Sequence, residues 1–258
     1  MQTAALEALG LADEWTYEAV DVEPGELAAR LRELPGQSFV GVNLTIPHKE
    51  AALEHADQAS EAATEIGAAN TLSFVDGLIH ADNTDAAGLL SALPGPDAGR
   101  TALVLGAGGS ARAAVWALAG HAASVSVWNR TPERADELVR DLGGAGARTA
   151  GARLSPISGE RARAGSFDLI VNCTAVGMAD EDPFQQLPLD RERFDAETVL
   201  VDLVYAGAES RLVREARKRN ATAIDGLEVL VRQGGESLRI WTGLDPPLDV
   251  MQAAVRGT

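Results

Sequence analysis

The sequence predicts a two-domain α/β protein in which a doubly wound parallel sheet follows a smaller α/β domain. From Thr101 onward, short apolar runs alternate regularly with helical segments, which is the pattern of βαβ units. The first 90 residues mix helix-like and strand-like segments less regularly. The proline- and glycine-rich residues 94–99 separate the two patterns and mark the best boundary.

The first domain should contain a hairpin flanked by helices. Asp76-Gly77 is a strong signal for a two-residue turn, because both residues tolerate positive φ. We expect strands over residues 15–22, 39–44, 71–75 and 78–81, and helices over 3–11, 26–34, from Pro47 onward, over 59–66 and over 86–93.

The second domain should be built on parallel strands. We expect them over residues 102–105, 125–128, 169–172, 199–204 and 222–224, with a loop over 143–151. Amphipathic helices should follow over residues 227–241 and 248–255.

The net charge of the chain limits the partners it can bind. The 258 residues carry a net charge of −16, so nucleic acid, whose phosphates need a basic face, is an improbable partner. An anionic small molecule would need local cations, of which Lys49, Arg112 and Arg130 are candidates. Either a saline habitat or genome composition explains the excess of acidic residues, and both explanations stay open.

The sequence favours a cytoplasmic protein. It has no apolar run near 18 residues, and its start lacks the basic region of a secretory signal. The single cysteine, Cys173, fits a reducing compartment and is expected to be a small buried thiol. The four histidines show no spacing typical of metal ligands, so no metal is expected.

Lys49 is one of only two lysines and has an unusual position. It follows the strand and turn of residues 41–48 (GVNLTIPH), where Pro47 suits the first turn of a helix. The helix dipole disfavours a cation there by roughly 0.3–1 kcal/mol. A lysine whose charged form is disfavoured is closer to being a usable acid or base near neutral pH, although a solvated surface lysine is the commoner case.

A nucleotide site is predicted after residue 105. Residues 101–105 run into Gly106, Ala107, Gly108, Gly109 and Ser110, and an alanine-rich helix follows. This is a G-x-G-x-x-A fingerprint in its strand–turn–helix context, so we expect a Rossmann-type domain with a pyrophosphate at the helix N-terminus.

The next strand indicates which dinucleotide binds. It ends in Asn129, Arg130 and Thr131 and has no carboxylate at its tip to accept hydrogen bonds from the ribose of NAD. Arg130 offers a guanidinium to a 2′-phosphate, and Arg134 could assist it. The alternative is a solvated loop arginine, but NADP is the expected cofactor.

Seven motifs in register resemble the shikimate dehydrogenase family along nearly the whole chain. They are GVNLTIPHK at 41–49, IGAANT at 66–71, DNTDAAG at 82–88, the glycine loop at 106, NRT at 129–131, VNCTAVGM at 171–178, and QG at 233–234 followed by WTG at 241–243. The resemblance implies that residues 1–88, completed by 226–258, form a substrate-binding domain and that residues 89–225 bind NADP.

The resemblance also implies roles for individual residues. Lys49 matches the family's general acid/base, and Asp85 matches the partner of that lysine. By spacing alone, Asp82 is an alternative carboxylate for this partner role. Asp85 could instead cap the helix that follows it. Thr45, Asn70, Tyr205 and Gln233 match substrate-contacting positions, and Leu203 and Gly226 match positions near the nicotinamide.

One departure concerns the start of the chain. Members of the resembled family begin with a strand and a Ser-x-Ser motif that holds the substrate carboxylate, whereas this sequence begins at Met1 on a later stretch and has no serine before Ser38. We therefore expect the chain as written to bind NADP but to turn over shikimate poorly.

The expected reaction is the reversible, NADP-dependent reduction of 3-dehydroshikimate to shikimate, a step in chorismate and aromatic amino-acid biosynthesis. The alternatives are a quinate/shikimate dehydrogenase and a catalytically impaired NADP-binding protein. A small-molecule substrate is the expected partner, and a homodimer is a possible assembly.

Overall fold

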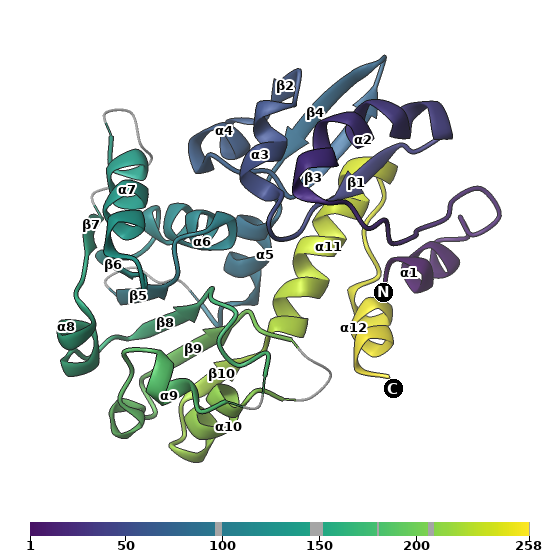
Figure 1. The fold of residues 1–258 in the computed structure, drawn as a ribbon. Helices are drawn as coiled ribbons and strands as arrows, with labels where there is room; N and C mark the ends of the chain where they lie inside the picture. Colours follow the sequence, from purple (N-terminus) through teal and green to yellow (C-terminus); the bar gives the residue numbers. More distant parts are fainter. Residues whose placement is uncertain (96–99, 145–151, 180, 206–208, 258) are drawn as a thin grey trace. The chain divides into compact units, whose positions relative to one another are not determined.

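The computed structural model describes residues 1–95, 100–144, 152–179, 181–205 and 209–257. It confirms an α/β fold with a parallel sheet and helices (Figure 1). Contacts divide the chain into two compact units. The N-terminal unit comprises Met1–Ser91 and Leu230–Thr258, and the parallel-sheet unit comprises Ala92–Val229.

The N-terminal unit has a four-stranded sheet in the order β1-β3-β4-β2. The antiparallel hairpin of β3 (Thr71–Val75) and β4 (Leu78–Asp82) turns at Asp76 and Gly77, whose φ angles of 53° and 79° are the positive values expected of such a turn. The edge strands are β1 (Gly41–Asn43), antiparallel to β3, and β2 (Gln58–Ala59), parallel to β4.

Helices cover both faces of this sheet. On one face, Leu27, Leu31 and Leu34 pack against Leu72 and Ala81. On the other, Trp241 Nε1 donates a 3.1 Å hydrogen bond to the Leu72 carbonyl. The helices of the unit are α1 (Gln2–Ala8), η1 (Pro24–Glu26), α2 (Leu27–Glu33), η2 (Leu34–Gln37), α3 (Lys49–Glu54), α4 (Glu61–Ile66), α5 (Asp85–Ala92), most of α11 (Gly226–Thr242), and α12 (Leu248–Arg256).

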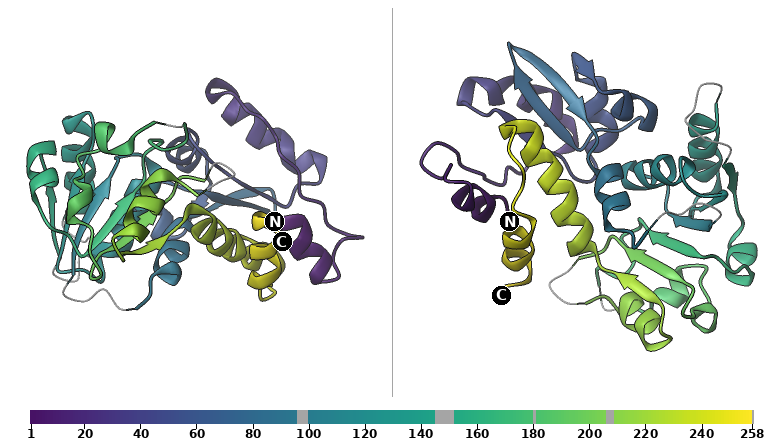
Figure 2. Two further views of the ribbon diagram at one scale, coloured as in Figure 1. Left: turned by 90° about the horizontal axis from the view of Figure 1, so that it is seen from below. Right: turned by 180° about the vertical axis from the view of Figure 1, so that it is seen from behind.

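The ends of the chain lie together within the N-terminal unit. Ala5 and Leu6 of α1 pack against Leu238 of α11 and Met251 of α12. Figure 2 shows α1 beside α12 in both views. The first and last helices thus share one small apolar core.

Two strand predictions for this unit need correction. Residues 15–22 form no strand in the structure, because no hydrogen-bonded partner strand lies beside them in the described part of the chain. The strand expected over residues 39–44 is limited to Gly41–Asn43 and is half-buried rather than buried, since it is an edge strand. The strand β2 was not predicted.

The parallel-sheet unit has six parallel strands in the order β10-β9-β8-β5-β6-β7. The five predicted strands are confirmed, although β9 ends at Asp202. The sixth, β7, was missed, and most of the predicted loop 143–151 lies outside the described residues. The strands are β5 (Thr101–Leu105), β6 (Ser124–Trp128), β7 (Arg153–Pro156), β8 (Leu169–Asn172), β9 (Val199–Asp202) and β10 (Thr222–Ile224).

Helices cover both faces of the parallel sheet. Leu103, Leu105 and Leu200 pack against α8, α9 and α10, and Figure 1 shows α6 and α7 on the opposite side. The helices are α6 (Gly109–Ala119), α7 (Pro132–Leu142), α8 (Gly159–Ala164), α9 (Pro183–Gln186), η3 (Arg191–Arg193) and α10 (Arg211–Lys218). The chain continues from β5 to β6 on one side and returns to β8 on the other, so the strand order reverses beside β5. Ligands of doubly wound sheets bind at the carboxyl ends of the strands beside such a reversal.

Candidate functional site

Lys49 is the first residue of α3 and lies beside β3. The helix begins after a turn closed by a 2.9 Å hydrogen bond from His48 N to Thr45 O, and the Ile46–Pro47 peptide bond in this turn is cis. The sequence had suggested that Pro47 occupies the first turn of the helix. In the structure Pro47 instead precedes the helix, which begins at Lys49. The Lys49 carbonyl accepts a 2.8 Å hydrogen bond from Ala69 N, which holds the start of α3 next to Asn70.

Lys49 pairs with Asp85, as the resemblance implied. Lys49 Nζ donates a 2.6 Å hydrogen bond to Asp85 Oδ2, and the two side chains are only 13% and 16% exposed. Asp85 is available for this contact because Asn83 Oδ1 accepts from the first N–H groups of α5, those of Asp85 and Ala86. The helix is thus capped by Asn83, and the capping role considered for Asp85 is wrong.

Asn70 connects this ion pair to its surroundings. It is 1% exposed, and its Nδ2 lies 2.8 Å from Asp85 Oδ1, 2.9 Å from Thr84 Oγ1 and 3.0 Å from Gln233 Oε1. An amide nitrogen has only two hydrogens for these three acceptors. Asn70 can therefore bond only two of them at a time, and the Thr84 hydroxyl can itself donate to Gln233 Oε1 at 3.5 Å.

Gln233 of α11 reaches Asn70 because α5 and α11 pack closely against each other. A Cβ at Gly88 of α5 would lie 2.7–2.9 Å from the Cβ, N and Cα atoms of Gln233, so only glycine permits this approach. One turn further along α11, Ser237 Oγ bonds Asn43 Nδ2 and Thr71 Oγ1, each at 2.8 Å. A continuous polar network therefore runs from β1 to the Lys49–Asp85 pair.

The remaining substrate candidates belong to other segments of the chain. Thr45 is exposed in the turn before α3. Tyr205 is 47% exposed and belongs to the parallel-sheet unit. The structure thus brings together Lys49, Asp85, Asn70 and Gln233.

The glycine loop has the geometry that a dinucleotide site requires. Gly106 has φ 112°, and a Cβ there would lie 3.2 Å from the backbone of Cys173, so both its conformation and its packing favour glycine. Gly108 precedes α6 without a side-chain cap, and a Cβ there would meet nothing within 4 Å. The N-terminus of this 11-residue helix thus has no side-chain cap from Gly108, which suits an anion.

The loop after β6 lies at the same end of the parallel sheet as the glycine loop. Leu105 and Trp128, the last residues of β5 and β6, are paired, and Gly106 N donates a 2.8 Å hydrogen bond to Trp128 O. Asn129 Nδ2 donates to Thr131 O at 2.9 Å and so shapes the turn into α7. The side chains of Arg130 and Arg134 are exposed and have no ion-pair partner among the described residues. Arg112, by contrast, pairs with Asp141 at 3.0 Å.

A buried pair that sequence reasoning missed connects the loops after β8 and β9. Asp202 Oδ1 accepts from Asn172 Nδ2 at 2.8 Å and from Val204 N at 3.3 Å, and its Oδ2 accepts from Ser210 Oγ. Burial is the main cause that raises the pKa of Asp202; the hydrogen bonds from Ser210, Asn172 and Val204 oppose it, and the charge of Asp225 adds to it. Asn172 Oδ1 accepts from the N–H and hydroxyl of Thr174.

Leu203 and Gly226 lie next to this pair. Leu203 N donates to Asn172 O at 3.0 Å, and Gly226 at the start of α11 lies against the Leu203 and Val204 backbone. Cys173, expected to be buried, is partly exposed because it follows the last residue of β8. The signal for Asn172 and Asp202 was available in the sequence, since each polar residue ends an apolar strand at the ligand-binding edge.

Family models match three consecutive parts of the chain. Residues 1–72 match the shikimate dehydrogenase substrate binding domain, residues 93–228 match shikimate / quinate 5-dehydrogenase, and residues 226–256 match the shikimate 5′-dehydrogenase C-terminal domain. The chain belongs to the shikimate dehydrogenase family.

Individual members of the family resemble the chain throughout its length. The shikimate dehydrogenase (NADP(+)) of Thermus thermophilus is 43% identical, with 99% of this chain and 91% of that protein covered. The enzyme of the same name from Methanothermobacter thermautotrophicus is 41% identical, with 99% and 90% covered. A crystal structure of the Thermus thermophilus enzyme in complex with NADP(H) and shikimate has a TM-score of 0.84 and 42% identity, covering 99% of this chain and 92% of that one.

Among the described residues, no helix is both long enough and apolar enough to cross a membrane.

Proposed function

We propose that this chain catalyses the reversible, NADP-dependent reduction of 3-dehydroshikimate to shikimate, in chorismate and aromatic amino-acid biosynthesis. The observation that carries the proposal is the largely buried Lys49–Asp85 pair, bonded at 2.6 Å and held by Asn70. A ketone reduction needs a proton donor of this kind beside the carbonyl oxygen. The relatives named above support the substrate and the cofactor.

In the N-terminal unit, Lys49 Nζ would donate a proton to the carbonyl oxygen during reduction and take the hydroxyl proton in the reverse reaction. Asp85 would hold the ammonium group in place and stabilise its charge. Asn70 and Gln233 would bind substrate hydroxyls, because Asn70 bonds both Asp85 and Gln233 and so holds these amides beside the Lys49–Asp85 pair. Thr45 and Tyr205 are the further substrate contacts that we propose.

The parallel-sheet unit fits NADP. Gly106, Ala107, Gly108, Gly109 and Ser110 would receive the pyrophosphate at the N-terminus of α6. Arg130, with Asn129, Thr131 and Arg134, would bind the 2′-phosphate, because the two guanidinium groups are exposed and lack an ion-pair partner among the described residues. Leu203 and Gly226 would lie near the nicotinamide. When bound, NADP supplies or accepts the hydride.

Four steady-state assays test the proposal. They combine shikimate or quinate with NADP or NAD, and kcat/KM should be highest for shikimate with NADP. Faster turnover of quinate would favour the quinate-using alternative, and NADP binding without turnover would favour the catalytically impaired one. The names of the relatives favour neither alternative. The same assay gives the shikimate KM, which tests the expectation of poor turnover in the chain as written.

We also propose that the chain acts as a homodimer in the cytoplasm. The exposed edge strand β2 leaves backbone groups available to a second copy. The single cysteine suits a reducing compartment. Sedimentation velocity at micromolar concentration should show a dimer, and cell fractionation should place the protein with cytoplasmic markers. A monomer at that concentration, or a membrane-associated protein, would contradict the respective proposal.

A further inference from the structure

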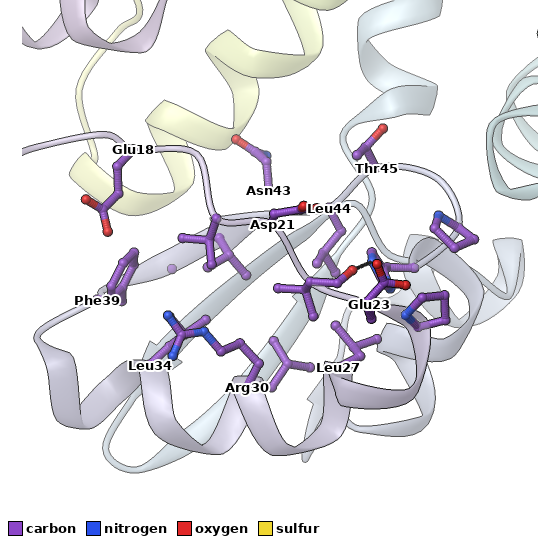
Figure 3. A pocket seen from close by; sticks show the side chains of 18 of the residues that line it. Glu18, Asp21, Glu23, Leu27, Arg30, Leu34, Phe39, Asn43, Leu44 and Thr45 are labelled. Atoms are coloured by element: carbon purple, nitrogen blue, oxygen red, sulfur yellow. Dashed lines mark hydrogen bonds between the residues drawn. The ribbon is translucent and has the colours of Figure 1, made fainter.

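Asp202 is the one carboxylate that is fully buried in the described part of the chain. Other carboxylates are exposed: Glu18, Asp21 and Glu23, for example, line a cavity of about 340 Å³ beside β1 in the N-terminal unit (Figure 3). Asp202 is the last residue of β9 and is 0% exposed. Burying a carboxylate is costly unless hydrogen bonds compensate it. The role of Asp202 must therefore follow from the groups that bond it.

Three donors surround the Asp202 carboxylate. Asn172 Nδ2, at the end of β8, donates to Oδ1 at 2.8 Å, and Val204 N, in the loop after β9, donates to the same oxygen at 3.3 Å. The Ser210 hydroxyl donates to Oδ2. Ser210 Oγ also accepts from Val213 N and so caps α10. Asp202 thus connects the end of β8, its own loop and the start of α10.

The carboxylate also fixes the direction in which the Asn172 amide faces. Asn172 is 0% exposed, so its amide must find its hydrogen-bond partners inside the protein. One hydrogen of Nδ2 is donated to Asp202 Oδ1, and the other reaches Val176 O at 3.2 Å. Oδ1 then faces Thr174, whose N–H and hydroxyl donate to it at 3.1 and 2.7 Å. A reversed amide would place its oxygen against two acceptors, so only this orientation fits.

The Asn172 amide in turn shapes the loop after β8. Thr174 Oγ1, which donates to Asn172, accepts from Val176 N at 3.1 Å and so closes the start of this loop. In the same loop Cys173 lies against the glycine loop, because a Cβ at Gly106 would lie 3.2 Å from the Cys173 carbonyl carbon and oxygen. The loop after β8 is thus tied to the loop after β9 on one side and packs on the glycine loop on the other.

These two loops lie on the side of the strand reversal away from β6. The sheet order is β10-β9-β8-β5-β6-β7, so the glycine loop after β5 lies between the two sides. A dinucleotide binds across such a reversal, with its pyrophosphate at the glycine loop. Since we place the 2′-phosphate at Arg130, after β6, the nicotinamide half would lie on the side of β8 and β9. Leu203 is on that side, directly after Asp202, and its N donates to Asn172 O at 3.0 Å.

We propose that Asp202 is a positioning residue for the nicotinamide half of the cofactor and acts through Asn172. The proposal rests on the NADP site proposed above for the parallel-sheet unit. Because Asp202 is 0% exposed, it would act without touching the cofactor. Removing its carboxylate would leave the loops after β8 and β9 without their common anchor. The loop of Arg130 would stay in place, because its turn is closed by Asn129 and Thr131.

The binding of two ligands tests this division of the site. NADP carries both halves of the dinucleotide, whereas adenosine 2′,5′-bisphosphate carries only the half with the 2′-phosphate. In calorimetric titrations, Asp202→Ala should weaken NADP binding about tenfold or more and change the bisphosphate Kd by less than about twofold. Asp202→Asn keeps an acceptor oxygen for Asn172 and should restore most of the NADP affinity. Equal weakening of both ligands, or of neither, would overturn the proposal.

Asp168→Ala is the matched control. Asp168 Oδ2 accepts from Thr101 N at 2.7 Å and from Thr101 Oγ1 at 2.9 Å, so it connects the starts of β5 and β8. It lies at the end of the strands opposite to Asp202. Its loss should therefore lower the Tm without changing the ratio of the two Kd values. A ratio that changes as much as in Asp202→Ala would show that general destabilisation is the cause, and would overturn the proposal.

Asn172→Ala tests the route of the effect and does not depend on the folding of Asp202→Ala. It removes the amide that Asp202 holds, so it should weaken NADP binding as selectively. If the two residues act in series, the double variant should bind NADP about as well as either single variant. Unselective weakening in Asn172→Ala, or two effects that multiply, would overturn the proposal. None of these measurements requires turnover of shikimate, so this inference and the proposed reaction can fail separately.

Discussion

The polar network around Lys49 in the N-terminal unit and the loop after β6 in the parallel-sheet unit hold their positively charged side chains in opposite ways. Lys49 is 13% exposed, and its Nζ is bonded to Asp85, which is bonded in turn to Asn70. Arg130 and Arg134 are exposed and have no ion-pair partner among the described residues. The proposed proton-transfer group is thus held in place before a ligand arrives, whereas the proposed phosphate-binding groups are left available for one.

Removing the lysine should produce the largest effect. Lys49→Ala should lower kcat by roughly 10²–10⁴, the usual contribution of a positioned acid or base, while the NADP Kd stays nearly unchanged. Steady-state kinetics and calorimetric titration with NADP measure the two quantities. Lys218→Ala is the matched control, because Lys218 is 66% exposed and, among the described residues, pairs only with Glu215 on the surface of α10. A near-normal kcat in the Lys49 variant would rule it out as the acid/base.

Reversing a charge in the loop proposed to bind the 2′-phosphate should produce the next largest effect. Arg130→Asp removes a charge-assisted hydrogen bond, worth roughly 1.5–3 kcal/mol, and adds repulsion, so NADP binding should weaken by roughly 10- to 100-fold or more. NAD binding should change much less. Arg140→Asp makes the same charge change at the other end of α7 and should leave the preference for NADP intact. If the Arg130 variant kept that preference, the assignment of the 2′-phosphate to this loop would be wrong.

Adding a methyl group at Gly88, where α5 packs against α11, should have a moderate effect on substrate binding and stability. Gly88→Ala would force a Cβ to within 2.7–2.9 Å of Gln233, and overpacking of this kind costs roughly 1–3 kcal/mol. Displacing Gln233 should raise the KM for shikimate and lower the Tm. Gly95→Ala, where a Cβ meets nothing within 4 Å, is the control for kinetics and thermal melting. An unchanged KM with an unchanged Tm would show that the two helices do not depend on this contact.

The smallest expected effect is a pH dependence of the free energy of unfolding that arises from Asp202. Because burial raises the pKa of Asp202 above its ordinary value of 3.8, the folded state binds the proton more tightly than the unfolded state. The contribution of Asp202 to the free energy of unfolding should therefore decrease as pH rises from about 3.8 through the folded pKa, and should stay constant above it.

Asp202→Asn removes this titration while keeping a side chain that can bond Asn172 and Ser210. The stability of the variant relative to the unchanged chain should therefore improve with rising pH over that window. Urea unfolding of both proteins between about pH 4 and pH 8 gives the difference. A difference that is flat, or that falls, with rising pH would contradict the raised pKa.

Local chemistry explains which parts of the fold the sequence predicted. Asp76-Gly77 predicts its hairpin because the two positive φ angles are a property of those residues alone. The strands β5, β8 and β9 are visible as apolar runs because almost all of their residues are buried in the centre of a sheet that helices cover on both sides. Residues 15–22 have a similar pattern but form no strand, because a strand needs a partner and a pattern does not supply one.

By itself, the sequence determined the α/β class, the glycine loop and the chemical types of the site residues, since these depend on local conformation and side-chain identity. The tertiary structure alone decided that Asn83, and not Asp85, caps α5, which leaves Asp85 to Lys49. It also decided that Gly88 brings Gln233 of α11 to Asn70, and that Asp202 and Asn172 connect two loops. Apart from the Asn83 cap, which is local, these contacts join residues far apart along the chain, and their geometry depends on how helices and strands pack rather than on any local pattern.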